Sequence, residues 1–244
     1  MAALVKIAHR GASGKFPENT RLAFEKAIEV GVDVIEMDCQ TTSDGHIVVF
    51  HDERLKRTAG ARGRLNSKTL EQLKKLDIGQ WKKMSFRGQQ VLTLEEVLEI
   101  VIPKVGLCLD IKQFDGSQPG MEIKLLFILS HYEYLDQTLF SSFDYQSLGR
   151  IRELAPEARI GLIYGVRVKE DPFVVARQLG ARSIHVQREM ATRAFLDRAW
   201  EAGLEVHVWT INDLREMEKF ASLGVQGIVS DYPEKFGRLK LLTN

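Results

Sequence analysis

A regular alternation of short apolar segments with longer segments of helical spacing constrains the fold of this chain more than any other feature. Eight apolar segments have the length of buried strands, and each is followed by a segment whose apolar residues recur at helical intervals. Eight such units within 244 residues predict parallel strands closed into a (β/α)8 TIM barrel. The predicted strands cover residues 5–8, 34–40, 105–111, 138–141, 159–163, 183–186, 205–209 and 227–229, and the predicted helices cover 20–30, 93–102, 121–130, 145–154, 172–179, 192–202, 214–223 and 233–241.

A doubly wound sheet is the main alternative for such a pattern. That fold is expected to carry a Gly-rich phosphate loop after a strand, and the chain contains neither G-x-G-x-x-G nor a P-loop. The alternation is broken once, after a predicted hairpin return at 47–50, by a basic, Gly-containing stretch with one short helical piece at 69–76. We therefore expect a single catalytic domain over residues 1–244, with a small insertion at approximately 53–90.

Composition and charge exclude several classes of protein. The 34 basic and 33 acidic residues nearly cancel, so the chain as a whole shows neither a nucleic-acid footprint nor a polybasic membrane face. No apolar run approaches the roughly 20 residues that span a bilayer, and the segment before the first strand is too short for a signal peptide. Cys39 and Cys108 lie on separate strands and are poorly placed to bridge, so we expect a cytoplasmic protein.

The predicted hairpin brings three reactive side chains to one point. Asp44-Gly45 between two apolar runs is typical of a two-residue turn, and this register places His51 opposite Asp38, with Glu36 on the same face. A three-residue loop would shift the pairing by one. A hairpin with a merely polar outer face is less consistent with the apolar chain around it.

Polar residues also gather where the other predicted strands end, as active-site residues do in a barrel of this kind. His9 and Arg10 follow the first strand, Asp110 and Lys112 end the third, and Trp209 ends the seventh.

Glu36, Asp38 and Asp110 offer three carboxylates, which suit a hard divalent ion, Mg²⁺ or Ca²⁺. A salt bridge with Lys112 or Arg10 is the alternative for Asp110 alone. His9 and His51 can exchange protons near neutral pH, while Arg10 and Lys112 can hold phosphate oxygens. This combination predicts cleavage of a phosphoester.

The same residues resemble the motifs of the glycerophosphodiester phosphodiesterase family, in order and over nearly the whole chain. The matching blocks are His9-Arg10-Gly11, Pro17-Glu18-Asn19-Thr20, Glu36-Met37-Asp38, His51-Asp52, Arg57-Thr58, Leu76-Asp77-Ile78-Gly79, Thr93-Leu94-Glu95-Glu96, Ser142-Phe143-Asp144, Trp209-Thr210-Ile211-Asn212 and Gly227 to Pro233. The sequence departs from the family at Asp110, where a Glu is usual, and at Val91-Leu92, where I-P is usual.

The resemblance implies a metal-dependent barrel that hydrolyses glycerophosphodiesters to sn-glycerol 3-phosphate and an alcohol. His9 and His51 would be the acid–base pair, with their individual roles left open, and Glu36, Asp38 and Asp110 would hold the ion. Arg10 and Lys112 would bind the phosphate. Trp209 would line the glycerol or leaving-group side, or simply plug the barrel mouth. The shorter Asp110 would need a water in the ion's shell or would change the ion preference.

Three other functions compete with this interpretation. A lysophospholipid could be cleaved on its headgroup side by the same chemistry, with an acyl groove near Trp81 and Phe86. A Schiff-base aldolase would use Lys112, and a non-catalytic barrel would bind phosphodiesters without turnover. In each case the partner expected is a small molecule, with no nucleic acid and no integral membrane segment.

Overall fold

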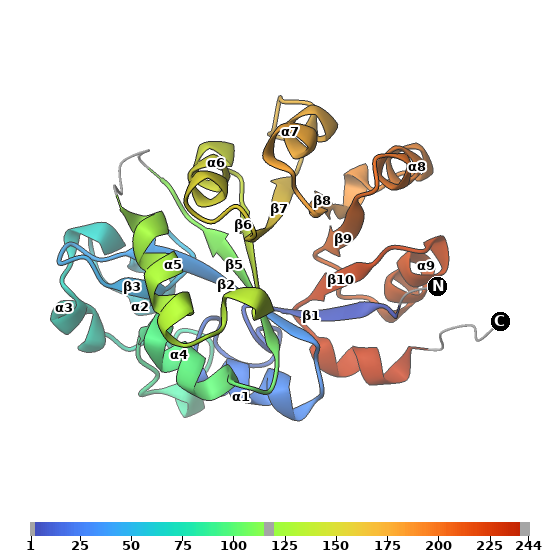
Figure 1. The fold of residues 1–244 in the computed structure, drawn as a ribbon. Helices are drawn as coiled ribbons and strands as arrows, with labels where there is room; N and C mark the ends of the chain where they lie inside the picture. The colour runs from blue at the N-terminus through green and yellow to red at the C-terminus, as the bar shows by residue number, and fades with distance from the viewer. Residues whose placement is uncertain (1–2, 115–119, 240–244) are drawn as a thin grey trace.

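The computed structural model describes residues 3–114 and 120–239, and its centre is a closed barrel of parallel strands (Figure 1). The strands follow the order β1-β10-β9-β8-β7-β6-β5-β2, and pairing of β1 with β2 closes the ring. This confirms the predicted (β/α)8 TIM barrel. Its strands are β1 (Val5–His9), β2 (Val34–Thr41), β5 (Gly106–Ile111), β6 (Thr138–Ser142), β7 (Arg159–Tyr164), β8 (Ser183–Gln187), β9 (Glu205–Trp209) and β10 (Gly227–Ser230).

Helices surround the barrel as predicted, except at the end of the chain. They are α1 (Arg21–Glu29), α4 (Leu94–Val101), α5 (Met121–His131), α6 (Tyr145–Leu154), α7 (Pro172–Leu179), α8 (Arg193–Glu201) and α9 (Leu214–Leu223). The last predicted helix, 233–241, is instead a 3-10 helix, η5 (Pro233–Arg238), and its predicted end lies outside the described residues. Its bonds span three residues, as from Leu239 N–H to Phe236 O, and Gly237 disfavours the continuation of an α-helix.

Helix caps fix where the loops of the barrel mouth end. Thr20 accepts from the backbone of Ala23 at the start of α1, and Thr93 forms a full capping box with Glu96 at the start of α4. Both residues stand at the start of helices predicted from the sequence, 20–30 and 93–102. The cap at Thr20 therefore fixes the C-terminal end of the loop that leads from β1 into α1.

Side chains alternate across β2 between the helix layer and the lumen. Ile35, Met37 and Cys39 are fully buried in the main apolar core, while Glu36 and Asp38 line the pocket described below. The strand thus presents its two carboxylates on one face, as the sequence predicted, and this face lines the pocket.

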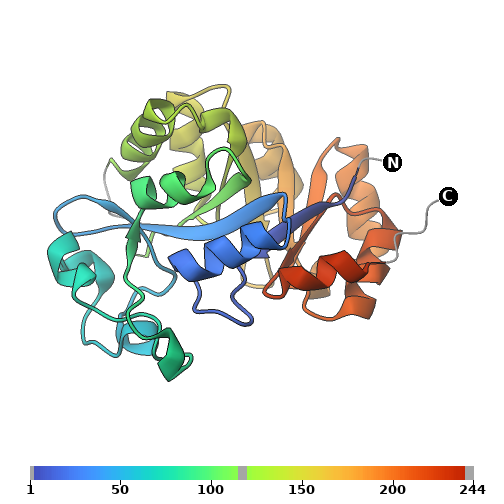
Figure 2. The ribbon, with the colours of Figure 1, turned by 90° about the horizontal axis from the view of Figure 1, so that it is seen from below.

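The stretch between β3 (Ile47–Val49) and β4 (Leu92–Thr93) forms a small body beside the barrel, which we call the lobe (residues 53–90; Figure 2). It holds more helical turns than the single piece predicted: α2 (Lys56–Ala59), η1 (Leu65–Ser67), α3 (Leu70–Lys74) and η2 (Met84–Phe86). It packs on a separate apolar cluster made of Val48, Phe50, Leu55, Leu65, Leu73, Ile78 and Val91.

The predicted pairing of Asp38 with His51 is wrong by one residue. Cys39 pairs with Val49, so the backbone of Asp38 faces Phe50, and the loop has three residues rather than two. The reason lies at Thr42, whose N–H donates to His46 O over 2.9 Å and whose hydroxyl accepts from His46 N over 2.9 Å. This closes a longer turn, in which Gly45 adopts a φ of 84°.

Among the described residues, no helix has both the length and the apolar character needed to cross a bilayer.

Candidate active site

One pocket at the C-terminal ends of the barrel strands contains every site residue predicted from the sequence. Its lining includes His9, Arg10, Glu36, Asp38, His51, Asp110, Lys112 and Trp209, together with Ser141, Phe143, Ile163, His185 and Val229. These residues come from all eight strands of the barrel, from the loops that follow them, and from the segment after β3. His51 belongs to this pocket despite the shifted hairpin register, because the chain has already left β3 at Val49.

Strand register explains why the carboxylates meet. Parallel pairing places His9 beside Glu36 across β1 and β2, and Asp38 beside Asp110 across β2 and β5. Carboxylate oxygens of Glu36, Asp38 and Asp110 lie within 4.8 Å of one another, and all three residues are buried.

The chemistry of this cluster fits a divalent ion. Its donors are all oxygens, as hard cations prefer, and Asp110 Oδ1 is buried without a hydrogen bond from any described residue. Burial and the neighbouring charge of Asp38 raise the pKa of Glu36 to about 7, so the carboxylates resist being charged together. A bound cation would relieve that repulsion.

Two cations of the chain already stand beside the cluster. Lys112 Nζ lies 3.0 Å from Asp38 Oδ1 and also bonds Asp110, and Arg10 Nε lies 3.2 Å from Asp38 Oδ2. Burial opposes charge on Asp38, but Lys112, Arg10 and His51 outweigh it and hold the pKa of that carboxyl well below its usual range. Asp110 therefore does form a salt bridge with Lys112, but its Oδ1 has no hydrogen-bond partner among the described residues.

Lys112 is unsuited to Schiff-base chemistry. Burial disfavours its ammonium, but the charges of Asp110 and Asp38 prevail and raise its pKa above the ordinary value. An amine must lose its proton to attack a carbonyl, so this environment argues against an aldolase.

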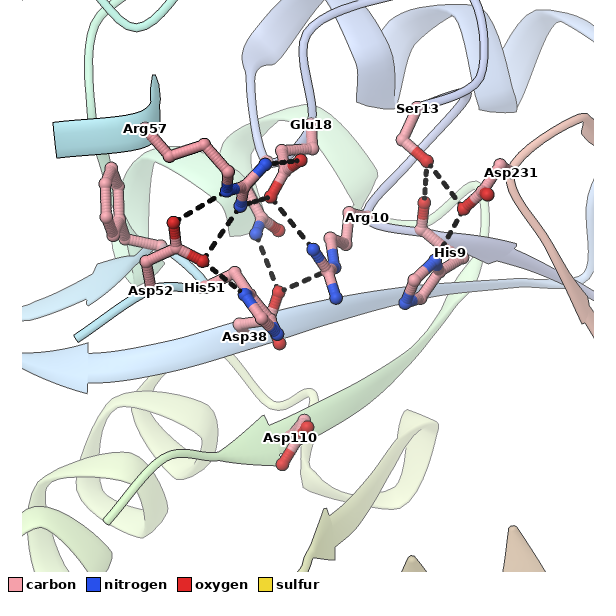
Figure 3. A network of polar contacts seen from close by, with 12 residues as sticks. His9, Arg10, Ser13, Glu18, Asp38, His51, Asp52, Arg57, Asp110 and Asp231 are labelled. Atoms are coloured by element: carbon pink, nitrogen blue, oxygen red, sulfur yellow. Dashed lines mark hydrogen bonds and ion pairs between the residues drawn. The ribbon is translucent and has the colours of Figure 1, made fainter. Parts of the chain in front are cut away.

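His9 is held by a network on the far side of the cluster. Its Nδ1 lies 2.6 Å from Asp231 Oδ1, which also accepts from Ser13 Oγ (Figure 3). Asn212 Nδ2 donates to the other oxygen, Asp231 Oδ2, over 2.6 Å. The opposite ring nitrogen, Nε2, lies 4.0 Å from Glu36 Oε2. With Nδ1 engaged by a carboxylate, Nε2 is the nitrogen left to exchange a proton with a ligand.

His51 is held in the same manner by a different network. Its Nδ1 lies 2.7 Å from Asp52 Oδ1, and Asp52 in turn accepts two bonds from Arg57. Arg57 grips both oxygens of Glu18 over 2.7 and 2.8 Å, and Glu18 accepts from Arg10 over 2.9 Å (Figure 3). A continuous chain of charged contacts therefore joins the lobe, through Arg57, to a cation of the pocket.

The two histidines differ in their affinity for protons. Burial lowers the pKa of His9, but the bond to Asp231 and the charge of Glu36 more than offset it, so its pKa is raised above 6.5. Burial also lowers the pKa of His51, and there Asp38 and Asp52 do not compensate. Opposed pKa directions in one pocket are typical of a pair that divides acid and base roles.

The loop after β1 needs a glycine at position 11 to hold Arg10 in its observed conformation. Arg10 itself has a φ of 55°, and Gly11 has a φ of 79° with its backbone against α1. A Cβ at Gly11 would lie 2.7 Å from the backbone of Ala23. The close approach of this loop to α1 therefore fixes the conformation that aims Arg10 at Asp38 and Glu18.

Trp209 borders the pocket on its apolar side. Its ring meets Phe143 edge-on at a centroid distance of 5.9 Å, and its Nε1 donates to His185 O over 2.8 Å. Both rings line the pocket, and Phe143 is 46% exposed. Trp209 therefore lines the pocket together with Phe143.

Comparison with known proteins shows to which family these motifs belong. A model of the Glycerophosphoryl diester phosphodiesterase family matches residues 9–235. The chain belongs to this family. A glycerophosphodiester phosphodiesterase of Caldanaerobacter subterraneus subsp. tengcongensis is 38% identical over 229 residues, which cover 93% of this chain and 94% of the relative. Membership confirms the family and the enzyme class expected from the sequence, a phosphoric diester hydrolase.

More distant members of the family extend the comparison. The structure of an Oleispira antarctica phosphodiesterase in complex with the product sn-glycerol-3-phosphate aligns with a TM-score of 0.91 at 30% identity, over 97% of this chain and 96% of that one. A human lysophospholipase D is 26% identical over 263 residues, covering 94% of this chain and 83% of the relative.

Several polar residues that hold this family member's pocket were not among the predicted site residues. They are Ser13, Glu18, Asn19, Asp52, Arg57, Asn212 and Asp231, and Asn19 donates to Asp38 Oδ2 over 2.8 Å. All but Ser13 lie in the motif blocks quoted above, so a signal was present. Their roles depend on contacts between loops that are distant in sequence, which spacing does not reveal.

Proposed function

We propose that this phosphodiesterase hydrolyses glycerophosphodiesters, such as glycerophosphocholine and glycerophosphoethanolamine, to sn-glycerol 3-phosphate and an alcohol in a metal-dependent reaction. One observation carries the proposal: two histidines, each held through Nδ1 by a carboxylate, stand at the same pocket as a cluster of three carboxylates. The relative that is 38% identical bears the name of this activity.

Glu36, Asp38 and Asp110 would hold Mg²⁺ or Ca²⁺, and the ion would supply charge stabilisation at the phosphate oxygens. Arg10 and Lys112 stand beside the cluster, where their cations can bind the phosphate. Trp209 and Phe143 would face the glycerol or the leaving alcohol.

His9 and His51 would move the protons. The glycerol hydroxyl beside the phosphate attacks phosphorus and gives its proton to one histidine, while the leaving alcohol takes a proton from the other. Water then opens the cyclic phosphate with the roles reversed. Because their pKa values are displaced in opposite directions, one histidine is ready to give a proton when the other is ready to accept one.

Turnover of glycerophosphocholine tests the histidines. His9→Ala and His51→Ala should each lower release of glycerol 3-phosphate by about 10²-fold or more, since general acid–base catalysis contributes at least that much. His46→Ala is the matched control, because His46 is exposed in the hairpin turn away from the pocket. Wild-type rates in either pocket variant would contradict the assignment.

Chelation tests the metal. Treatment with EDTA should abolish turnover, and added Mg²⁺ or Ca²⁺ should restore it. Turnover that is indifferent to the chelator would contradict the metal requirement while leaving the substrate class intact.

Lysophospholipids are the second candidate substrates. The apolar side of the pocket, with Phe143 46% exposed beside Trp209, favours them, and so does the similarity to the human lysophospholipase D. Choline release from lysophosphatidylcholine, measured beside release from glycerophosphocholine, separates the two. A faster reaction on the lysolipid would make it the preferred substrate.

We also propose that the chain acts as a single catalytic domain with the lobe as its insertion. The two buried free thiols, Cys39 and Cys108, support the expected cytoplasmic location.

A further inference from the structure

The near-neutral net charge of the chain hides a strongly uneven distribution. Residues 53–90 contain 11 Lys or Arg and 3 Asp or Glu, a net charge of +8. The rest of the chain carries the other 23 basic and 30 acidic residues, a net charge of −7. The positive charge is therefore concentrated on the lobe, a small body beside the barrel (Figure 2).

Exposed apolar side chains stand among these cations. Met84 is 67% exposed and Trp81 is 36% exposed, and both lie in the segment that also carries Lys82, Lys83 and Arg87. The ring of Trp81 is flanked by cations, with Arg57 at 5.4 Å and Lys82 at 5.7 Å from its centroid. An amphipathic aromatic ring surrounded by Lys and Arg is the composition found at membrane–water interfaces.

This segment of the lobe contacts the loop after β1, which supplies Arg10 to the catalytic pocket. Lys82 Nζ donates to the backbone oxygen of Ser13, in the loop that follows β1. The ring of Phe86, in the lobe, meets the ring of Phe16, in the same loop as Ser13, at a centroid distance of 5.8 Å. A surface that docks through this segment therefore comes to rest beside the loop that supplies Arg10 to the pocket.

We propose that the lobe docks this phosphodiesterase on an anionic lipid bilayer, with Trp81 and Met84 entering the headgroup layer and the surrounding lysines and arginines facing acidic lipid. Charge complementarity selects the anionic surface, because cations near such a membrane are attracted within a Debye length. The exposed apolar side chains favour a bilayer over a nucleic acid, whose phosphates would use only the cations.

Sedimentation with vesicles tests the proposal without reference to catalysis. The wild-type chain should pellet with vesicles that contain phosphatidylglycerol, should remain in solution with pure phosphatidylcholine vesicles, and should be released by high salt. The double variant Lys83→Glu, Met84→Ser should weaken partitioning to the anionic vesicles at least tenfold, because it reverses a charge and removes an inserted side chain.

A matched control makes the same two kinds of change elsewhere, an apolar side chain to Ser and a cation to Glu. Val174 and Arg177 are exposed on α7, whose barrel neighbours β7 and β8 lie across the ring from β2, so Val174→Ser, Arg177→Glu should partition as the wild type does. Both double variants should hydrolyse glycerophosphocholine at the wild-type rate, so a failure to dock is distinguishable from a failure of the proposed activity.

Three results would overturn the proposal: no binding of the wild type to anionic vesicles, equal binding of the lobe variant and the control, or equal binding to neutral vesicles. Binding to a double-stranded DNA fragment but not to vesicles would overturn the choice of partner.

Discussion

At the scale of single residues, the site depends on how its histidines are held. Each ring has one nitrogen committed to a carboxylate, His9 to Asp231 and His51 to Asp52, and both carboxylates have further donors of their own. At histidines that bind metals, fixing the tautomer and orientation of the ring in this way is worth about 10–100-fold. The partners of the histidines should therefore matter almost as much as the rings.

Asp231→Asn tests this directly. The substitution removes the charge that holds up the pKa of His9, so that pKa should fall, and turnover should fall by roughly 10–100-fold. NMR titration of the His9 ring measures the pKa, and hydrolysis of glycerophosphocholine measures turnover. Ser13→Ala is the matched control, since it removes one hydrogen bond from Asp231 but keeps the charge. An unchanged titration of His9 would contradict the role of Asp231.

Sequence reasoning identified the residues of the pocket but not the residues that hold them. Positions such as Glu36 and Asp110 were predictable because strand ends converge at one rim of a barrel. Glu18 and Arg57 were not, because their contact joins two loops 39 positions apart that no periodicity connects. Loop-to-loop contacts of this kind depend on the finished tertiary structure.

At the scale of elements, the loop between β1 and α1 is the most constrained part of the mouth. A side chain at Gly11 would need both a φ of 79° and space that the backbone of Ala23 occupies. Gly11→Ala should lower the free energy of unfolding by about 3 kcal/mol or more and displace Arg10.

Gly60→Ala is the comparison for that measurement. Gly60 also has a positive φ, of 62°, but an added Cβ would meet nothing within 4 Å, so the expected loss is only about 1 kcal/mol. Denaturant unfolding measures both variants. Equal losses would show that the approach to α1 is unimportant.

Strand β9 carries a buried histidine that should make stability depend on pH. Burial lowers the pKa of His207 to about 4, from 6.5 for an exposed ring. Below pH 6.5 the unfolded chain binds a proton that the folded chain does not, so stability falls as pH drops from 6.5 towards 4, by roughly 3 kcal/mol in total.

His207→Leu should remove that part of the pH dependence, as measured by the free energy of unfolding between pH 7.5 and pH 4.5. His131→Leu is the control, because His131 is exposed on α5. If both variants keep the wild-type dependence, the buried ring of His207 is not its source.

Secondary structure was predicted best where a local signal decides it. The capping residues Thr20 and Thr93 begin helices as expected. The hairpin register was missed because Asp44-Gly45 alone suggests a two-residue turn, whereas the hydrogen bonds of Thr42 with His46 close a three-residue one. The prediction of an α-helix at 233–241 was wrong because Gly237 weakens a segment whose apolar spacing is otherwise helical.

At the scale of the whole molecule, a bound divalent ion should stabilise the fold. Ligands that bind only the folded state at about 100 times their dissociation constant add about 2.7 kcal/mol. For a chain of this length that corresponds to a rise in melting temperature of roughly 5–10 °C. Thermal unfolding with Mg²⁺, with Ca²⁺ and with EDTA measures the effect.

Asp110→Asn keeps the shape of the cluster but removes one charge, and it should abolish most of the rise. Asp136→Asn controls for loss of a carboxylate away from the pocket, because Asp136 lies in the turn before β6. An ion that stabilises the Asp110 variant as much as the wild type would place the binding site elsewhere.

The barrel itself was predictable because eight repeated units leave few ways to bury their apolar faces. The lobe was recognisable as an interruption, but its own small core was not, since Leu55 and Ile78 belong to no repeating pattern. The alternation of strands and helices does not show how the lobe is attached to a closed barrel, which has no free strand edge.

The attachment lies within β2. On one edge this strand pairs with β1 up to Glu36, and from Cys39 onward the same edge pairs with β3. Ring closure is thus complete three residues before the hairpin begins, with Asp38 at the junction. The segment attached to the outer half of β2 can therefore change in length or charge without opening the ring, and any such change lies next to the catalytic residues.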